Sequence, residues 1–204
     1  MPEIALFPLE LVLMPSEQVP LHIFEPRYRE LIGECLTEGR EFGLLLEDED
    51  GRREVGTRAG VVEVLEVFDD GRMNVVVEGR ERFRVLEPTD GRSFPTGEVE
   101  SVDDEADPAS ANDVDRALTL FRRLAEAAEA DVEEPEELPA ALSFALAARI
   151  DFGVELKQDL LELRSERTRL ARLTELMERA IGAIEREREV RERAAGNGKV
   201  SPSS

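Results

Sequence analysis

The chain has 204 residues and a formal net charge of −21, from 47 acidic and 26 basic side chains. A surface this negative repels nucleic-acid backbones and anionic lipid, so neither nucleic acid nor a membrane is expected as a partner. Apolar residues make up 41% of the chain, which is enough for a buried core. The single cysteine, Cys35, excludes an internal disulfide and favours a reducing, cytoplasmic location.

The first predicted elements are two short strands and a helix. Pro8 and Pro15 fix the backbone φ and lack a donor, so the first strand is limited to a segment around Ile4–Phe7 and a turn follows it. Pro26 suits the first turn of a helix, because that turn needs no backbone donor there. After Pro26 the apolar residues recur at the spacing of one helix face. These residues, which we expect to be buried, are Tyr28, Leu31, Ile32, Cys35 and Leu36.

The next sixty residues predict mainly strands. Two long runs rich in β-branched residues flank a turn at residues 69–72, which is typical of a β-hairpin. Gly79 predicts a bulge or bend in the second run. The expected strands cover Glu41–Leu46, Val55–Phe68, Met73–Leu86 and Gly97–Val102. Several short strands bent by glycines, together with one small helix, indicate a partly closed β-barrel.

The second half of the chain predicts helices. Residues 103–110 are polar and form the expected linker. Four amphipathic helices with short connections then indicate a bundle. They should begin at Ser110 or Asn112, near Leu138, at Glu155 and after Ser165. The sequence therefore predicts an α+β protein with a β-barrel over residues 1–105, a helical bundle over 110–193 and a disordered tail over 194–204.

The motifs of common catalytic sites are missing from the sequence. It contains no GxxxxGK[ST] phosphate loop, and its two lysines, Lys157 and Lys199, fall in a polar helix and in the predicted tail. The acidic run at 47–51 lacks the spacing of a calcium loop, and a lone histidine does not make a zinc site. We therefore predict no enzyme activity, no metal and no cofactor.

For several polar residues the sequence is compatible with either a structural role or a ligand-binding role. His22 alternates with two apolar neighbours and should face away from them, where it either hydrogen-bonds within the turn before Pro26 or touches a ligand at a rim. Arg27 either pairs with a carboxylate such as Glu25 or binds an anion. Three arginines on one strand face form either a basic stripe or pairs with glutamates such as Glu63 and Glu66. They are Arg80, Arg82 and Arg84.

The run PLHIFEPRYRE at residues 20–30 resembles the N-terminal substrate-binding domain of Lon proteases, in the form that occurs as a separate small protein. The segments at 55–57, 75–79 and 82–85 share the resemblance. It implies a PUA-like β-barrel followed by a helical bundle. The positions that match the family as structural signature residues are Pro8, Pro20, Glu25, Pro26, Tyr28, Gly56, Gly79 and Phe83.

The resemblance implies a non-enzymatic module that recognises unfolded or specific protein clients, alone or with a protease machine, and that lacks the ATPase and peptidase of Lon. The alternatives are an RNA or small-molecule-binding PUA-like protein and a hydrolase that uses paired carboxylates. Client binding predicts an exposed apolar groove. The candidate residues for this groove are Phe7, Leu9, Val12, Leu13, His22, Phe24, Arg27 and Phe94. For the apolar residues among them, the other interpretation is burial in the core.

Overall fold

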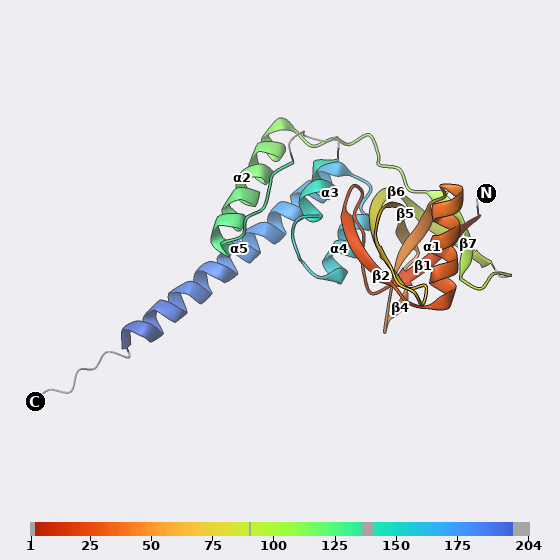
Figure 1. Ribbon diagram of the computed structural model, residues 1–204. Coiled ribbons are helices and arrows are strands. Elements are labelled where there is room, and N and C mark those ends of the chain that lie inside the picture. The colour runs from red at the N-terminus through yellow and green to blue at the C-terminus, as the bar shows by residue number, and fades with distance from the viewer. Residues whose placement is uncertain (1–2, 90, 136–140, 198–204) are drawn as a thin grey trace, which may run out of the picture.

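The computed structural model describes residues 3–89, 91–135 and 141–197. A barrel of strands with one helix lies beside a group of four helices (Figure 1). The strands are β1 (Glu3–Leu9), β2 (Gln18–Ile23), β3 (Phe42–Asp48), β4 (Gly51–Arg52), β5 (Val55–Val67), β6 (Met73–Thr89) and β7 (Thr96–Ser101). The helices are α1 (Pro26–Glu38), α2 (Ala111–Ala128), α3 (Leu142–Ala147), α4 (Val154–Glu162) and α5 (Glu166–Asn197). The predicted α+β class and the order of barrel and bundle are confirmed.

The strands close into a barrel because β1 pairs with two others. Its first half is antiparallel to β7 and its second half is parallel to β3, which joins the ends of the sheet order β1-β7-β6-β5-β3. β1 runs through Pro8 to Leu9, so the prediction that the proline stops this strand near Phe7 is wrong. Pro8 is tolerated because β1 pairs there only with β3, and a missing donor on the free side breaks no ladder bond.

Helix α1 covers one side of the barrel. It begins at Pro26 as predicted and ends at Gly39, whose φ of 65° is the left-handed conformation that glycine adopts readily. Four of the five predicted face residues are buried, and Leu36 is not. At about 100° per residue, Leu36 lies about 80° around the helix from Tyr28, at the margin of the buried stripe.

The bundle is built on α5, which packs against α2 and α3. Ser110 caps α2 and forms a capping box with Asp113, which selects the first of the two predicted starts. α3 covers only Leu142–Ala147 of the helix expected from Leu138 to Ile150, and residues 136–140 lie outside the described part. α5 continues to Asn197, beyond the start of the predicted tail. The rest of that tail, residues 198–204, lies outside the described residues.

The barrel and the bundle share a buried junction. The apolar cluster of the bundle includes Val12, Met14, Leu46 and Val55 from the barrel side. Residues 103–110 form no element, as expected of a linker, but they are anchored at the junction by bonds such as Glu105 N to the carbonyl oxygen of Arg164, at 2.7 Å. The two halves are therefore in direct apolar contact.

Buried charges lie in the middle of this junction. Arg169 of α5 is fully buried, and its Nη2 lies 2.6 Å from Asp104 Oδ2 and 2.7 Å from Glu166 Oε2. Its guanidinium also lies 3.8 Å from the ring centroid of Phe144. Arg82 of β6 shares the carboxylate of Asp104. Each buried cation thus has an anion, which is the condition under which charge is tolerated in a core.

Arg82 is buried, unlike the other two arginines of the predicted stripe on β6, Arg80 and Arg84. Burial lowers the pKa of Arg82, and the charge of Asp104 opposes that shift. Arg80 and Arg84 are exposed and pair with Glu41 and Glu100. Neutralisation therefore replaces the basic stripe, but Glu63 and Glu66 are not the partners, because the strand register places them nearer the hairpin tip, opposite Val76 and Asn74.

Candidate functional site

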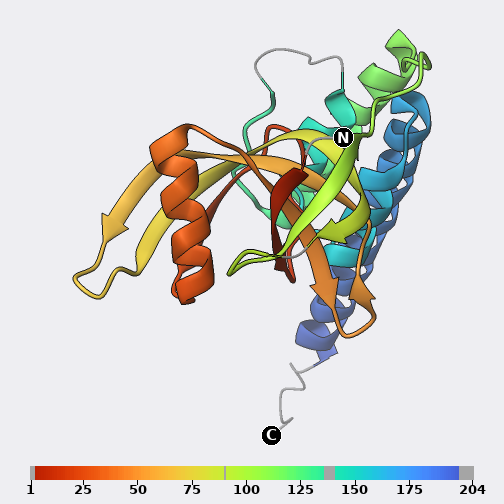
Figure 2. The same cartoon turned by 90° about the vertical axis from the view of Figure 1, so that its right-hand side faces the viewer.

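The distal part of the β5–β6 hairpin projects beyond α1 (Figure 2). Five large apolar side chains on it and beside it are between 40% and 65% exposed. They are Phe24, Val62, Val64, Leu65 and Val67, which we call the hairpin patch. The other exposed large apolar side chains of the described residues, Leu36, Leu86 and Val190, come from three separate elements.

The pairing of β5 with β6 explains why these residues are apolar and yet exposed. Val64 pairs with Val75 and Val67 pairs with Met73, and directly paired residues lie on the same face of a sheet. Val75 is fully buried in the cluster that contains Tyr28 and the other buried residues of α1. Val64 and Val67 of the hairpin patch therefore continue the core face of the barrel beyond α1, whereas Phe24 stacks on His22, which pairs with Asn74 on the other face.

Two irregularities shape this end of β5. The register shifts between Val61 and Glu63, and again between Val64 and Glu66, so Val62 and Leu65 are extra residues without a partner on β6. Beyond Ala59, β5 has no pairing with β3, so its outer edge is free among the described residues. Bulges interrupt the regular backbone edge that a complete added strand needs, which favours contacts through side chains.

His22 connects Phe24 to the hairpin. Its Nδ1 lies 2.6 Å from Asn74 Oδ1 on β6, so the hydrogen bond runs across the sheet and not within the turn before Pro26. The imidazole is stacked on Phe24 at 6.0 Å between centroids and meets Phe68 edge-on at 6.1 Å. His22 is exposed while Ile23 is buried, as its alternation predicts.

The other candidate residues lie elsewhere. Four of them are at most 4% exposed and belong to the two apolar cores, which is the alternative interpretation given above. They are Phe7, Val12, Leu13 and Phe94. Leu9 is half-buried against the barrel core. Arg27 pairs with Glu25 at 2.9 Å and lies 4.5 Å from the ring centroid of Tyr28, so the first of its two interpretations holds.

Of the residues proposed from the sequence, Phe24 therefore belongs to the hairpin patch and His22 lies beside it, whereas the four patch residues on β5 were not among the candidates. The signal that could have found them is the segment VVEVLEV, residues 61–67. Its apolar residues do not keep the period of two that a half-buried strand requires, so some of them must be exposed.

The signature positions have structural surroundings. Pro20 lies in the edge strand β2, and Phe83 is fully buried in the barrel. A Cβ added at Gly79 would lie 2.1 Å from the carbonyl oxygen of Met14, and one at Gly56 would lie 2.3 Å from that of Leu44. The pairing shifts register beside Gly79, as the sequence predicts.

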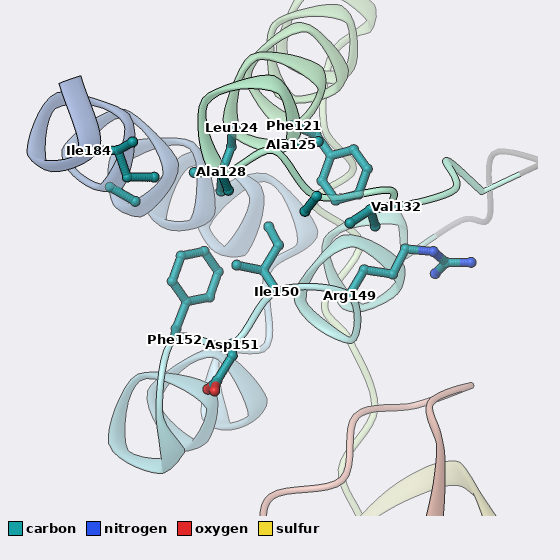
Figure 3. A pocket seen from close by; sticks show the side chains of 12 residues that line it. Phe121, Leu124, Ala125, Ala128, Val132, Arg149, Ile150, Asp151, Phe152 and Ile184 are labelled. Atoms are coloured by element: carbon teal, nitrogen blue, oxygen red, sulfur yellow. The ribbon is translucent and has the colours of Figure 1, made fainter. Parts of the chain in front are cut away.

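Besides the hairpin patch, the bundle contains an apolar hollow (Figure 3). It has a volume of about 300 Å³ and is lined mainly by apolar side chains of α2, α5 and the segment 149–152, among them Phe121, Leu124, Ile150, Phe152 and Ile184. Arg149 and Asp151 lie at its margin, and Arg149 donates to the carbonyl oxygens of Glu133 and Ala145 at 3.0 and 2.7 Å. The hollow is at the lower end of the size of ligand pockets, roughly 300–1,000 Å³.

Reactive groups are few in the part of the chain that the structure covers. No group of three or more His, Cys, Asp or Glu side chains there is placed to hold a metal ion. Burial raises the pKa of the Cys35 thiol to about 11, which keeps it protonated and unreactive. None of the described helices combines the length and the apolar character that crossing a membrane requires.

Known proteins resemble this chain over most of its length. Lon protease 1 of Hydrogenovibrio crunogenus is 26% identical over 202 residues, which cover 90% of this chain and 24% of that protein. The Lon protease of Paraburkholderia phytofirmans is also 26% identical, over 91% of this chain and 25% of its own. The chain thus spans about a quarter of the length of these relatives.

Solved structures agree with this likeness. The Lon N-terminal domain protein from Xanthomonas campestris has a TM-score of 0.66 and 26% identity, over 85% of this chain and 97% of that one. The N-terminal domain of the Mycobacterium avium complex Lon protease has a TM-score of 0.64 at 19% identity, over 87% and 98%, and shows the shared fold. Residues 3–179 match the sequence model of the ATP-dependent protease La (LON) substrate-binding domain. The chain therefore belongs to the family of Lon substrate-binding domains.

Proposed function

We propose that this protein is a non-enzymatic recognition module that binds exposed apolar segments of other proteins through the hairpin patch. The observation that carries the proposal is the gathering of five exposed large apolar side chains, four of them on the β5 strand of the projecting hairpin and the fifth, Phe24, just beyond the end of the adjacent strand β2. Apolar patches that stay open to water on a folded domain mark contact surfaces. The family match supports recognition as the task, because its model describes a substrate-binding domain.

The geometry suits weak, reversible binding. The patch lies on paired strands whose far ends belong to the barrel, so its side chains are held before a client arrives. Full burial of such a side chain contributes roughly 1.5–3 kcal/mol. Covering the exposed half of five side chains therefore contributes about 5 kcal/mol, before the entropy of association is subtracted. Clients would be bound and released without any chemical step, and a protease machine is the partner that would use such a module.

An RNA-binding function has less support. A site for single-stranded nucleic acid needs a basic groove with exposed aromatic side chains. On the described strands, Arg80, Arg82 and Arg84 are each paired with a carboxylate, and the patch itself carries one aromatic ring, that of Phe24.

Substitution of the patch tests the proposal. The double variant Leu65→Asn, Val67→Asn should weaken binding of a fluorescently labelled, permanently unfolded protein at least about tenfold in an anisotropy titration, since it removes two contact side chains. Val190→Asn is the matched control, because Val190 is as exposed as Val67 but lies on α5. Equal affinities for the patch variant and the unsubstituted protein would refute the proposal.

A third variant separates the patch from the bundle hollow. Ala128 is exposed and lines that hollow, so Ala128→Phe places a ring there without disturbing the core. We expect unchanged affinity for the unfolded protein. Loss of binding in Ala128→Phe together with full binding in the patch variant would move the site to the bundle.

A further inference from the structure

We infer that the hairpin patch selects extended segments in which large apolar residues alternate with lysine or arginine. This inference rests on the proposed function and names its substrate class. It follows from the charges that surround the patch, from their lack of internal partners and from the position of the charges at a free strand edge.

The hairpin is strongly acidic. Residues 60–78 contain five carboxylates and one arginine, which gives a net charge of −4. Glu63 lies between Val62 and Val64 in the chain, and Glu66 lies between Leu65 and Val67. Every apolar residue of the patch on β5 therefore has an acidic neighbour in the sequence.

These acids are not neutralised by the protein itself. Glu63, Glu66 and Asp69 form no ion pair with any residue that the structure describes. Among the described residues, the side chains of these three acids accept one hydrogen bond, which Asn74 Nδ2 donates to Glu66 at 3.2 Å. Of the two nearby arginines, one is ion-paired and the other is hydrogen-bonded to a backbone carbonyl. Arg72 pairs with the side chain of Asp70, and Arg29 donates to its carbonyl oxygen.

The register places the two kinds of side chain on opposite faces of one strand. Val64 and Val67 pair with Val75 and Met73 on the core face, whereas Glu63 and Glu66 pair with Val76 and Asn74 on the outer face. β5 is the edge of the ribbon here. An extended segment beside this edge, held by side-chain contacts and not by a continuous backbone ladder, would present successive side chains alternately to the apolar face and to the acidic face.

Charge complementarity then decides which segments fit. Each lysine or arginine placed beside Glu63 or Glu66 contributes about 0.2–1 kcal/mol as an exposed ion pair, and acidic residues at the same positions are repelled. Attraction of a basic segment by the acidic hairpin also speeds its association, and salt weakens that effect. The client is thus distinguished by its charges while the apolar contacts supply most of the affinity.

Three labelled peptides test the inference. They share alternating leucine and valine residues and carry arginine, glutamine or glutamate at the intervening positions. We expect the arginine peptide to bind about fivefold more tightly than the glutamine peptide, as two exposed ion pairs would give, and the glutamate peptide to bind weakest. The preference for arginine should shrink between 50 mM and about 500 mM salt.

The double variant Glu63→Gln, Glu66→Gln should lose the preference for arginine and keep its affinity for the glutamine peptide. The matched control is Asp115→Asn, Glu126→Gln, which removes the same charge from exposed positions of α2. Equal binding of arginine and glutamine peptides would overturn this inference but leave the proposed function intact, provided that Leu65→Asn, Val67→Asn weakens both. If that patch variant changes neither affinity, or no peptide binds, the proposed function fails as well.

Discussion

The junction and the hairpin patch both place charged side chains next to apolar ones, but with opposite results. At the junction, Arg169 is fully buried and both of its carboxylate partners, Asp104 and Glu166, are in contact with it. At the hairpin, Glu63 and Glu66 remain in water with no cation beside them among the described residues. A buried charge is tolerated only if the protein itself supplies a partner of opposite charge. An exposed charge is solvated by water, so it can remain unpaired in the free protein and pair with a group on another molecule. The junction therefore holds the two halves together, and the hairpin is available for contact.

The largest effect is expected from breaking the junction. Arg169→Met keeps an extended apolar side chain but leaves the buried Glu166 without its cation and Asp104 with Arg82 alone, so the free energy of unfolding should fall by about 3–5 kcal/mol. Urea denaturation monitored by circular dichroism measures the loss. Arg172→Met on the same helix removes an exposed pair with Glu175 and should cost less than about 1 kcal/mol. Similar losses in both variants would show that the junction charges contribute no more than surface charges do.

A smaller effect is expected where the hairpin leaves the barrel. Gly79→Ala brings a methyl group to within 2.1 Å of the carbonyl oxygen of Met14, so the backbone must shift, and we expect a loss of about 2 kcal/mol. Gly33→Ala is the control, because an added Cβ meets nothing within 4 Å on α1. The control should gain about 0.5–1 kcal/mol, since alanine favours a helix over glycine. Equal thermal unfolding midpoints for the two variants would contradict the close approach at Gly79.

The smallest effect is expected at the patch itself. Val64 and Val75 are direct partners on one face, yet Val75 is fully buried and Val64 is 40% exposed. Val64→Ala should change the free energy of unfolding by about 0.5 kcal/mol, and Val75→Ala by about 2 kcal/mol, because only the second leaves a cavity in a packed core. A loss at Val64 as large as that at Val75 would mean that the patch is structural core, and the comparison with the junction would fail.

The local features of this chain were determined by its sequence. The start of α1 at Pro26, the cap of α2 at Ser110 and the β5–β6 turn agree with the structure because each depends on residues within one or two turns of chain. The buried stripe of α1 agrees too, apart from Leu36 at its margin. Periodicity and capping carry this information without reference to the rest of the fold.

The tertiary structure alone decided what lies beside each of these elements. Pro8 stays in β1 because one side of that strand is free, Arg82 is buried because the linker supplies Asp104, and the patch stays open because the hairpin projects sideways past α1. The local sequence around Pro8, Arg82 and the patch residues does not determine any of these outcomes. Exposure depends on whether another element covers a face, and that is fixed only when segments distant in sequence pack together.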